Sequence, residues 1–327
     1  MRIPRLIGCL VILAGCGSDA PGPSQPPPPP PPPPPPDPRW STAAPLPEPL
    51  QEFHAAVLDG WIYIAGGIGE NNADSDRAYR YDPESDRWER IADLPFPHHH
   101  MPLAVANDSL YAIGGLRTVQ GGFEPARHLW LYDVDADRWV GRAGLLNSRG
   151  ASAVGVVGGK LVVVGGYGFD AELVEPVDIY DPATNSWSAG ADIPTPRDHL
   201  TAAAVDGIVY AIGGRRVSVD AVVDAVEAYD LETDEWTTRS PMPTRRAGLG
   251  STASGGRVYV YGGEEFGAAF RTHAAYDPSN DTWESLPRML EGRHGAGVAA
   301  VGGRIFVIGG GPDTGFSQST TVQVFTP

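Results

Sequence analysis

The sequence predicts an all-β protein, a six-bladed β-propeller with four antiparallel strands in each blade. Six pairs of adjacent glycines each end an apolar run, and they recur about 49 residues apart on average. Five of these units also carry a Tyr-Asp pair, with a tryptophan seven residues after the tyrosine. Glycine and proline are abundant, at 41 and 33 of 327 residues, which favours many turns over long helices.

The first two strands of each blade are predicted by the apolar runs and the turns before them. The runs are rich in β-branched and aromatic residues, as second strands should be. The glycine pairs that end them are Gly66-Gly67, Gly114-Gly115, Gly165-Gly166, Gly213-Gly214, Gly262-Gly263 and Gly309-Gly310. A two-residue turn precedes each run, from Asp59-Gly60 in the first unit to Gly302-Gly303 in the sixth. Because such residues tolerate positive φ, each turn predicts a tight hairpin with a first strand before it.

The third and fourth strands are predicted by the tyrosine and tryptophan of each unit. The third strand is expected to end at Tyr81, Tyr132, Tyr180, Tyr229 and Tyr276. The fourth is expected to contain Trp88, Trp139, Trp187, Trp236 and Trp283. We expect these aromatic side chains to pack between neighbouring blades and not to form a ligand cage.

The sixth unit lacks its tryptophan. Phe325 takes the tyrosine position, and a tryptophan seven residues later would fall beyond residue 327. Trp40 stands before the first unit without a blade of its own. We therefore expect the segment around Trp40 to add the outer strand of the last blade, which closes the ring and removes an exposed sheet edge.

This combination of glycine pair, tyrosine and tryptophan resembles the kelch repeat, from Pro38 to the C-terminus. The kelch family includes galactose oxidase, whose copper centre uses a tyrosine cross-linked to a cysteine. Both cysteines of this chain, Cys9 and Cys16, precede the repeat, so that cofactor cannot form here. At the level of blade number and export, the chain is also similar to bacterial sialic-acid mutarotases, which implies a sugar-acid epimerase as the alternative function.

The residues before the repeat predict export and lipid anchoring. Arg2 and Arg5 precede a short apolar stretch, as in a signal peptide, which we place at residues 1–15. The stretch ends in Leu-Ala-Gly-Cys16, which resembles the lipobox of bacterial lipoproteins and implies a diacylglycerol on Cys16. A proline-rich linker is expected over residues 16–37, ahead of the propeller at 38–327. Gly17 after the cysteine implies retention in the outer membrane of the bacterial cell envelope.

The candidate ligand-binding residues lie on the face that carries the second-to-third loops, because those loops vary in length and composition. Arginine and histidine are frequent at the positions sixteen residues before each glycine pair and at the positions next to them. We expect these positions to lie on the same face. The candidates there are Glu52, His98, His100, Arg149, Arg197, His199, Arg246, Arg293 and His294, and Arg215 is added at the rim from the loop after a glycine pair. Together they predict a funnel that captures a carboxylate or sulfate. The alternative is structural, with the arginines bonded to carbonyl groups between blades.

Composition limits the remaining function classes. The formal net charge of −16 disfavours nucleic acid and anionic lipid heads, so membrane contact is expected through the lipid alone. In a strand, at most two of His98, His99 and His100 point the same way, and no metal or other cofactor is predicted. The sequence predicts a monomer that binds an extracytoplasmic protein or glycan, and it names no catalytic residue.

Overall fold

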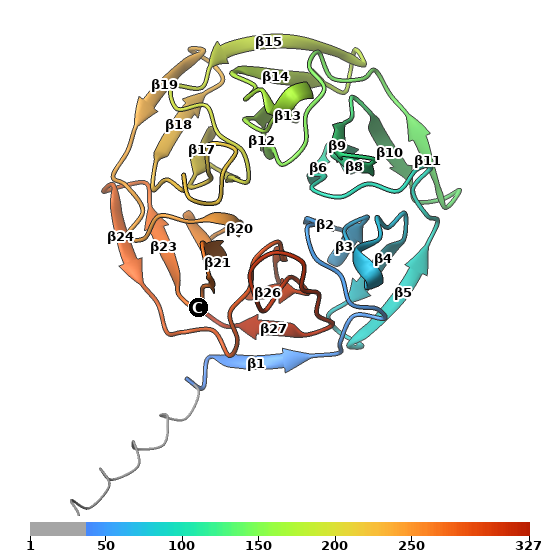
Figure 1. Ribbon diagram of the computed structural model, residues 1–327, viewed down its shortest axis with the longest axis vertical. Coiled ribbons are helices and arrows are strands. Elements are labelled where there is room, and N and C mark those ends of the chain that lie inside the picture. The colour runs from blue at the N-terminus through green and yellow to red at the C-terminus, as the bar shows by residue number, and fades with distance from the viewer. Residues whose placement is uncertain (1–36) are drawn as a thin grey trace, which may run out of the picture. The chain divides into compact units, whose positions relative to one another are not determined.

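The computed structural model describes residues 37–327, which form six four-stranded antiparallel sheets arranged around a central channel (Figure 1). The predicted fold class is confirmed. The predicted signal peptide, Cys16 with its predicted lipid and the predicted linker up to residue 36 lie outside the described residues. Within residues 37–327, no helix is both long and apolar enough to cross a membrane.

The first three blades follow the chain from the channel outwards. Blade 1 consists of β2 (Ala55–Leu58), β3 (Trp61–Ala65), β4 (Ala78–Asp82) and β5 (Arg87–Ile91). Blade 2 consists of β6 (Leu103–Ala106), β7 (Ser109–Ile113), β10 (Leu129–Asp133) and β11 (Arg138–Gly141). Blade 3 consists of β12 (Ala153–Val157), β13 (Lys160–Val164), β14 (Pro176–Asp181) and β15 (Ser186–Asp192).

The last three blades repeat this order, and the sixth takes its outer strand from the start of the described chain. Blade 4 consists of β16 (Thr201–Val205), β17 (Ile208–Ile212), β18 (Val226–Asp230) and β19 (Glu235–Thr238). Blade 5 consists of β20 (Ala247–Ser254), β21 (Arg257–Glu265), β23 (His273–Asp277) and β24 (Thr282–Ser285). Blade 6 consists of β25 (Gly297–Val301), β26 (Arg304–Ile308), β27 (Val322–Phe325) and β1 (Trp40–Ala43).

The loops between second and third strands carry the remaining short elements. They are the hairpin β8 (Leu116–Val119) and β9 (Gly122–Pro125), the two-residue β22 (Ala268–Ala269), and the 3₁₀ turns η1 (Glu70–Asn72) and η2 (Phe169–Ala171). These loops differ from blade to blade, whereas the first-to-second turns are alike. In the first turn, for example, Asp59 and Gly60 have φ of 51° and 81°. Both residues of all six turns have positive φ, which matches the twist of the hairpin strands.

The ring is closed by β1, as expected. β1 pairs antiparallel with β27, and Trp40 stands opposite Phe325. The two rings lie 5.0 Å apart, the spacing found between Tyr132 and Trp139 within blade 2. Trp40 therefore occupies the tryptophan position that the C-terminal unit lacks.

Each outer-strand tryptophan ties its blade to the preceding one. Its indole Nε1 donates to a backbone carbonyl at or just after the end of the preceding blade's outer strand, over 2.6–3.1 Å. The pairs are Trp40 with Pro287, Trp88 with Ala44, Trp139 with Ala92, Trp187 with Ala143, Trp236 with Ala191 and Trp283 with Ser240. The expected packing of these aromatic residues between blades is confirmed.

The tyrosines of blades 1–5 add a second tie. Each tyrosine hydroxyl donates to an oxygen of Asp86, Asp137, Asn185, Asp234 or Asp281. The same oxygen accepts a backbone N–H from the preceding blade. One side-chain oxygen thus joins two blades through two hydrogen bonds.

The glycine pairs form the third tie. We call Leu50, His98, Arg149, Arg197, Arg246 and Arg293 the junction residues. The carbonyl of each junction residue accepts the N–H of the second glycine of the preceding blade, over 2.6–3.0 Å. A Cβ on the first glycine of the pair would collide with this carbonyl, which explains why only glycine stands there.

Candidate functional site

A closed ring of backbone hydrogen bonds surrounds the axis at the loop end of the channel. We call its members the ring residues, and each lies two positions after a junction residue. They are Glu52, His100, Ala151, His199, Gly248 and Gly295. Each ring N–H donates to the ring carbonyl of the preceding blade over 2.7–3.1 Å, and the bond from Glu52 to Gly295 completes the circle.

All six ring residues have positive φ, between 51° and 60°. This conformation is natural for glycine but costs other residues about 1–2 kcal/mol each. Glu52, His100 and His199 are long polar side chains held there in spite of that cost. Strained polar residues of this kind are concentrated at functional sites, which makes these three the centre of the candidate site.

Two cavities meet at the ring. The channel cavity, of about 350 Å³, is lined by all six ring residues and by the first strands of the blades. The loop-face pocket, of about 810 Å³, is lined by Glu52, His100 and His199 together with the second-to-third loops. The three polar ring residues therefore form both the floor of the pocket and the ceiling of the channel cavity.

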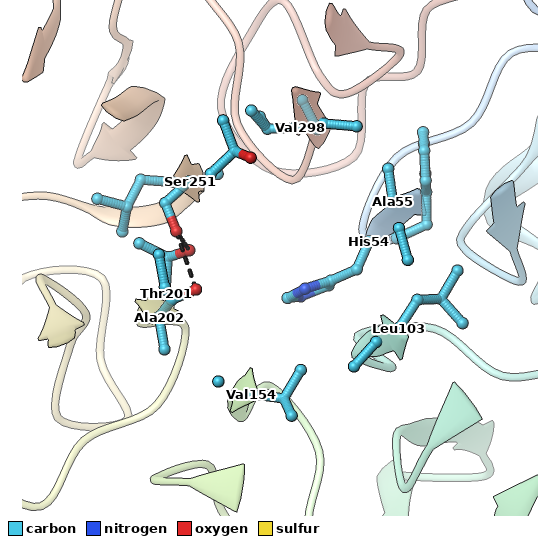
Figure 2. Close-up of a pocket in the computed structure, with 18 of the residues that line it drawn as sticks. His54, Ala55, Leu103, Val154, Thr201, Ala202, Ser251 and Val298 are labelled. Carbon is cyan, nitrogen blue, oxygen red and sulfur yellow. Dashed lines mark hydrogen bonds between the residues drawn. The ribbon is translucent and has the colours of Figure 1, made fainter. Parts of the chain in front are cut away.

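Most of the residues that line the channel cavity have small apolar side chains. Figure 2 shows the imidazole of His54 reaching into its open space, opposite Thr201 and Ser251 and beside apolar side chains such as Val154 and Leu103. The hydroxyls of Thr201 and Ser251 are 2.6 Å apart, and Ser251 donates to the carbonyl of Ala202. Burial lowers the pKa of His54 to about 4, so this imidazole is neutral at pH 7.

One half of the pocket floor is centred on Glu52. One of its oxygens lies 3.0 Å from His100 Nε2, and the other lies 3.5 Å from His294 Nε2. His100 is held from behind by a hydrogen bond between its Nδ1 and Nδ1 of His99. A Cβ at position 295 would strike the Glu52 carboxylate, so Gly295 makes the space for this side chain.

The other half of the floor is centred on His199. Its Nδ1 bonds to the buried carboxylate of Asp198, which leaves Nε2 to accept a hydrogen bond of 2.8 Å from Arg215. Arg215 also lies 3.4 Å from Asp198 and 3.3 Å from Glu264. The guanidinium is therefore already neutralised by two carboxylates.

The charge states follow from burial and from these contacts. Burial, followed by the charge of Arg215, lowers the pKa of His199 to about 4, so His199 is neutral at pH 7. Burial tends to raise the pKa of Glu52, but His100, His294 and His199 outweigh it and hold that pKa well below its usual value. Glu52 is a carboxylate at pH 7.

The rim of the pocket is apolar. Phe123, Phe266 and Phe316 line it from blades 2, 5 and 6, with exposed fractions of 41%, 78% and 57%. Val217 of blade 4 and Tyr167 of blade 3 fill the sides between them. Large exposed phenylalanines around one opening are unusual on a soluble surface and indicate a contact surface.

The structure brings together half of the predicted site residues. Glu52, His100, His199, Arg215 and His294 line the loop-face pocket. His98 does not. Its Nδ1 bonds to the carbonyl of Phe96, and its ring packs edge-on against His128 beside a separate surface hollow.

The four junction arginines do not line the pocket or the channel, and this corrects the expected arginine funnel. Arg149, Arg197, Arg246 and Arg293 are at least 96% buried. Arg149 shows why, since it bonds to the carbonyls of Gly165 and Pro176 in its own blade and pairs with Asp178 at 3.0 Å. The alternative expectation was that the arginines bond to carbonyl groups between blades. Arg149 does bond to carbonyl groups, but these belong to its own blade.

Sequence reasoning missed the three rim phenylalanines. Phe266 and Phe316 each stand beside a glycine within a few residues of a glycine pair. An aromatic residue next to glycine in a loop of this kind is a signal for an exposed apolar tip, and it could have identified them. The ring itself is marked only by its spacing, two residues after each junction residue.

The fold and the pocket define a class of protein, a closed six-bladed propeller with a binding cavity at the loop end of its channel. Residues 99–310 match the family described as the KLHDC2/KLHL20/DRC7 Kelch-repeats domain, and residues 49–95 match the Kelch motif. The chain therefore belongs to the kelch-repeat family. Kelch propellers generally mediate protein interactions.

The relatives are similar over part of their length. Kelch-like protein 25 of Xenopus tropicalis is 31% identical over 52% of this chain and 30% of its own length. The F-box/kelch-repeat protein At1g67480 of Arabidopsis thaliana is 32% identical over 30% of this chain and 26% of its own length. The chain thus spans less than a third of these relatives. The solved structure of YjhT superposes with a TM-score of 0.74 at 18% identity, covering 86% of this chain and 96% of that one, which shows the fold alone.

Proposed function

We propose that this protein binds a partner through its loop face, with the aromatic rim as the contact surface and the pocket receiving a projecting group. The observation that carries the proposal is the ring of exposed phenylalanines around a pocket of about 810 Å³ with a polar floor. Aromatic anchors dominate the energetics of protein interfaces, and a pocket of this size accepts a side chain, a chain end or a sugar residue.

The partner favoured by this surface is a protein. The rim is apolar, and Arg215, the one arginine lining the pocket among residues 37–327, is already paired with Asp198 and Glu264. A carboxylate or sulfate would have to displace one of these partners. An apolar segment with a neutral or cationic polar tip fits without that cost, and a neutral glycan is the second ligand class that does so.

The place of action is part of the proposal. We propose export, lipid attachment at Cys16 and retention in the outer membrane of a bacterial envelope, supported by the leader and the four residues that end at Cys16. The proline-rich residues 16–37 would then serve as a stiff spacer before the propeller.

The experiment compares the chain with a Phe266→Ala, Phe316→Ala double variant. Binding is measured on a glycan array and against proteins that are identified from a pulldown and then purified. We expect the double variant to weaken partner binding at least about tenfold, because it removes two aromatic anchors. Phe96→Ala is the matched control, since Phe96 is 48% exposed but does not line the pocket.

If the double variant binds as tightly as the parent chain, the rim is not part of the recognition surface. Binding to glycans alone would replace the protein partner by a carbohydrate at the same site. The same proteins also test the second candidate function.

The second candidate is a sugar-acid epimerase or mutarotase. It is favoured by the contact between Glu52 and His100, which puts a carboxylate and an imidazole on the pocket floor as an acid and base pair. Acceleration of anomer exchange in N-acetylneuraminate, followed by NMR and lost in Glu52→Gln, would establish it. If anomer exchange proceeds at the uncatalysed rate, the epimerase function is excluded and partner binding remains the proposed function.

A further inference from the structure

The polar ring residues form a cluster whose donors suit a metal ion. One carboxylate oxygen of Glu52 and one ring nitrogen each of His100 and His199 lie within 4.8 Å of one another. Two imidazoles and one carboxylate are a frequent ligand set for divalent first-row transition ions. Because the three residues come from blades 1, 2 and 4, the closed propeller is needed to assemble the cluster.

The residues behind the cluster hold the imidazoles as metal sites require. His199 Nδ1 bonds to Asp198, which leaves Nε2 directed to the cluster. His100 Nδ1 bonds to His99, and its Nε2 faces Glu52. A ligand histidine that bonds a carboxylate or another polar group through its second nitrogen is typical of metal centres.

The local charge also favours a cation. Three carboxylates, those of Glu52, Asp198 and Glu264, lie at this end of the channel with one guanidinium, that of Arg215, which contacts Asp198 and Glu264. Glu264 lies 3.8 Å from His294 Nε2, and His294 lies 3.5 Å from Glu52, so acidic groups continue around the floor. A divalent cation would compensate this excess of negative charge.

We propose that Glu52, His100 and His199 bind a divalent first-row transition ion at the floor of the loop-face pocket. The ion takes the place between Glu52 and His100, whose facing atoms now lie 3.0 Å apart, and it displaces the hydrogen bond from Arg215 to His199. With three protein ligands, its remaining coordination positions face the pocket and are open to water or to a donor atom of a bound partner. The proposal does not depend on the partner binding proposed above.

Zn²⁺ is the probe, and binding to the full chain is measured by titration calorimetry. We expect one site per chain that is weakened at least about a hundredfold in Glu52→Gln and in His199→Ala. Ala151 already occupies a ring position with φ of 52°, so an alanine at position 199 can keep the ring backbone. Melting curves recorded without metal verify that each variant is folded.

Two further variants sharpen the test. Arg215→Met removes the group that competes for His199, and we expect it to bind Zn²⁺ at least as tightly as the parent chain. His128→Ala is the matched control, because His128 lies beside His98 outside the pocket and should leave Zn²⁺ affinity unchanged. Absorption spectra with Co²⁺ then separate this site from Cys9 and Cys16, since only thiolate ligands give a strong charge-transfer band.

The proposal is overturned if the parent chain shows no saturable Zn²⁺ site. It is equally overturned if Glu52→Gln and His199→Ala bind Zn²⁺ as the parent does, or if the Co²⁺ spectrum is that of thiolate ligation. Because no partner or sugar enters these measurements, their failure leaves the proposed partner binding untouched.

Discussion

At the scale of single residues, the glycine pairs separate two reasons for keeping glycine. Gly262 and Gly255 both lie in blade 5 and have nearly the same φ, 59° and 58°. A Cβ on Gly262 would collide with the carbonyl of Arg293 in the next blade, whereas a Cβ on Gly255 would meet open space. Position 255 therefore requires only a residue that tolerates positive φ. Position 262 also requires a residue without a Cβ, because the next blade lies too close.

We predict that Gly255→Ala lowers the free energy of unfolding by about 1–2 kcal/mol, the cost of alanine at positive φ. Gly262→Ala should lower it by about 2–4 kcal/mol, because backbone overpacking is added to the same strain. Urea unfolding of the two variants measures both values. Equal losses would mean that the close approach of the blades contributes nothing.

The sequence located the site residues better than it oriented them. It placed Glu52, His100 and His199 on the loop face correctly, because their distance from the glycine pair is the same in every unit. It could not show that Arg197, two residues before His199, turns into its own blade to bond the carbonyls of Gly213 and Ala211. That direction follows from these backbone carbonyls and from the buried carboxylate of Glu227, and the residue pattern does not show which of its groups the arginine will reach.

At the scale of blade elements, the tie between tyrosine and carboxylate depends on ionisation. The hydrogen bond from tyrosine lowers the pKa of the aspartate it contacts, and a backbone N–H from the preceding blade adds to this in each case. The aspartates are Asp86, Asp137, Asp234 and Asp281. Blade 3 has Asn185 instead, which accepts the same two bonds without a charge.

We predict that the melting temperature falls as the pH drops below about 4. A carboxyl group whose pKa is lowered in the folded state stabilises the fold fully above its ordinary pKa, and this contribution is lost as the pH falls through the lowered value. Changing all four aspartates to asparagine should flatten the acid limb of a plot of melting temperature against pH.

Asn185 shows that the asparagine variant can keep both hydrogen bonds at neutral pH. Asp108→Asn, in an exposed hairpin turn, is the control and should leave the acid limb unchanged. An acid limb as steep in the fourfold variant as in the parent chain would place the acid sensitivity elsewhere.

At the scale of the whole molecule, closure joins the two ends of the described chain. β1 supplies four pairs to β27, and Trp40 is buried against Tyr261, His273 and Phe325. Its indole also donates to Pro287 of blade 5. Blade 6 and its contact with blade 5 therefore depend on residues far away in sequence.

We predict that deletion of residues 38–43 lowers the melting temperature by about 5 °C or more, since it removes a buried tryptophan and exposes the edge of β27. Deletion of Gln120 and Gly121, at the tip of the β8–β9 hairpin, is the control and should change the melting temperature little. A melting curve unchanged by the first deletion would show that closure does not stabilise the ring.

The propeller was predictable from the sequence because six copies repeat the same turns and aromatic residues in register. The pocket was not, since it is built by second-to-third loops that have no common pattern. Phe123 lies in the β8–β9 hairpin of blade 2, Phe266 lies at the turn between β21 and β22 of blade 5, and Phe316 lies in a loop without strands. These phenylalanines lie around one pocket only because the closed ring of blades brings their loops together, and the sequence does not show this.

The ring residues share one backbone conformation and one set of hydrogen bonds, and they differ only in what projects from them. Ala151, Gly248 and Gly295 thus have the same backbone position as Glu52, His100 and His199 but no polar side chain. A Cβ at Gly248 would meet only ordinary contacts, so the side chain at this ring position can be exchanged without altering the strands beneath, whereas Gly295 must stay glycine to leave room for Glu52. A protein built in this way can acquire a new specificity by a single substitution while its architecture stays constant.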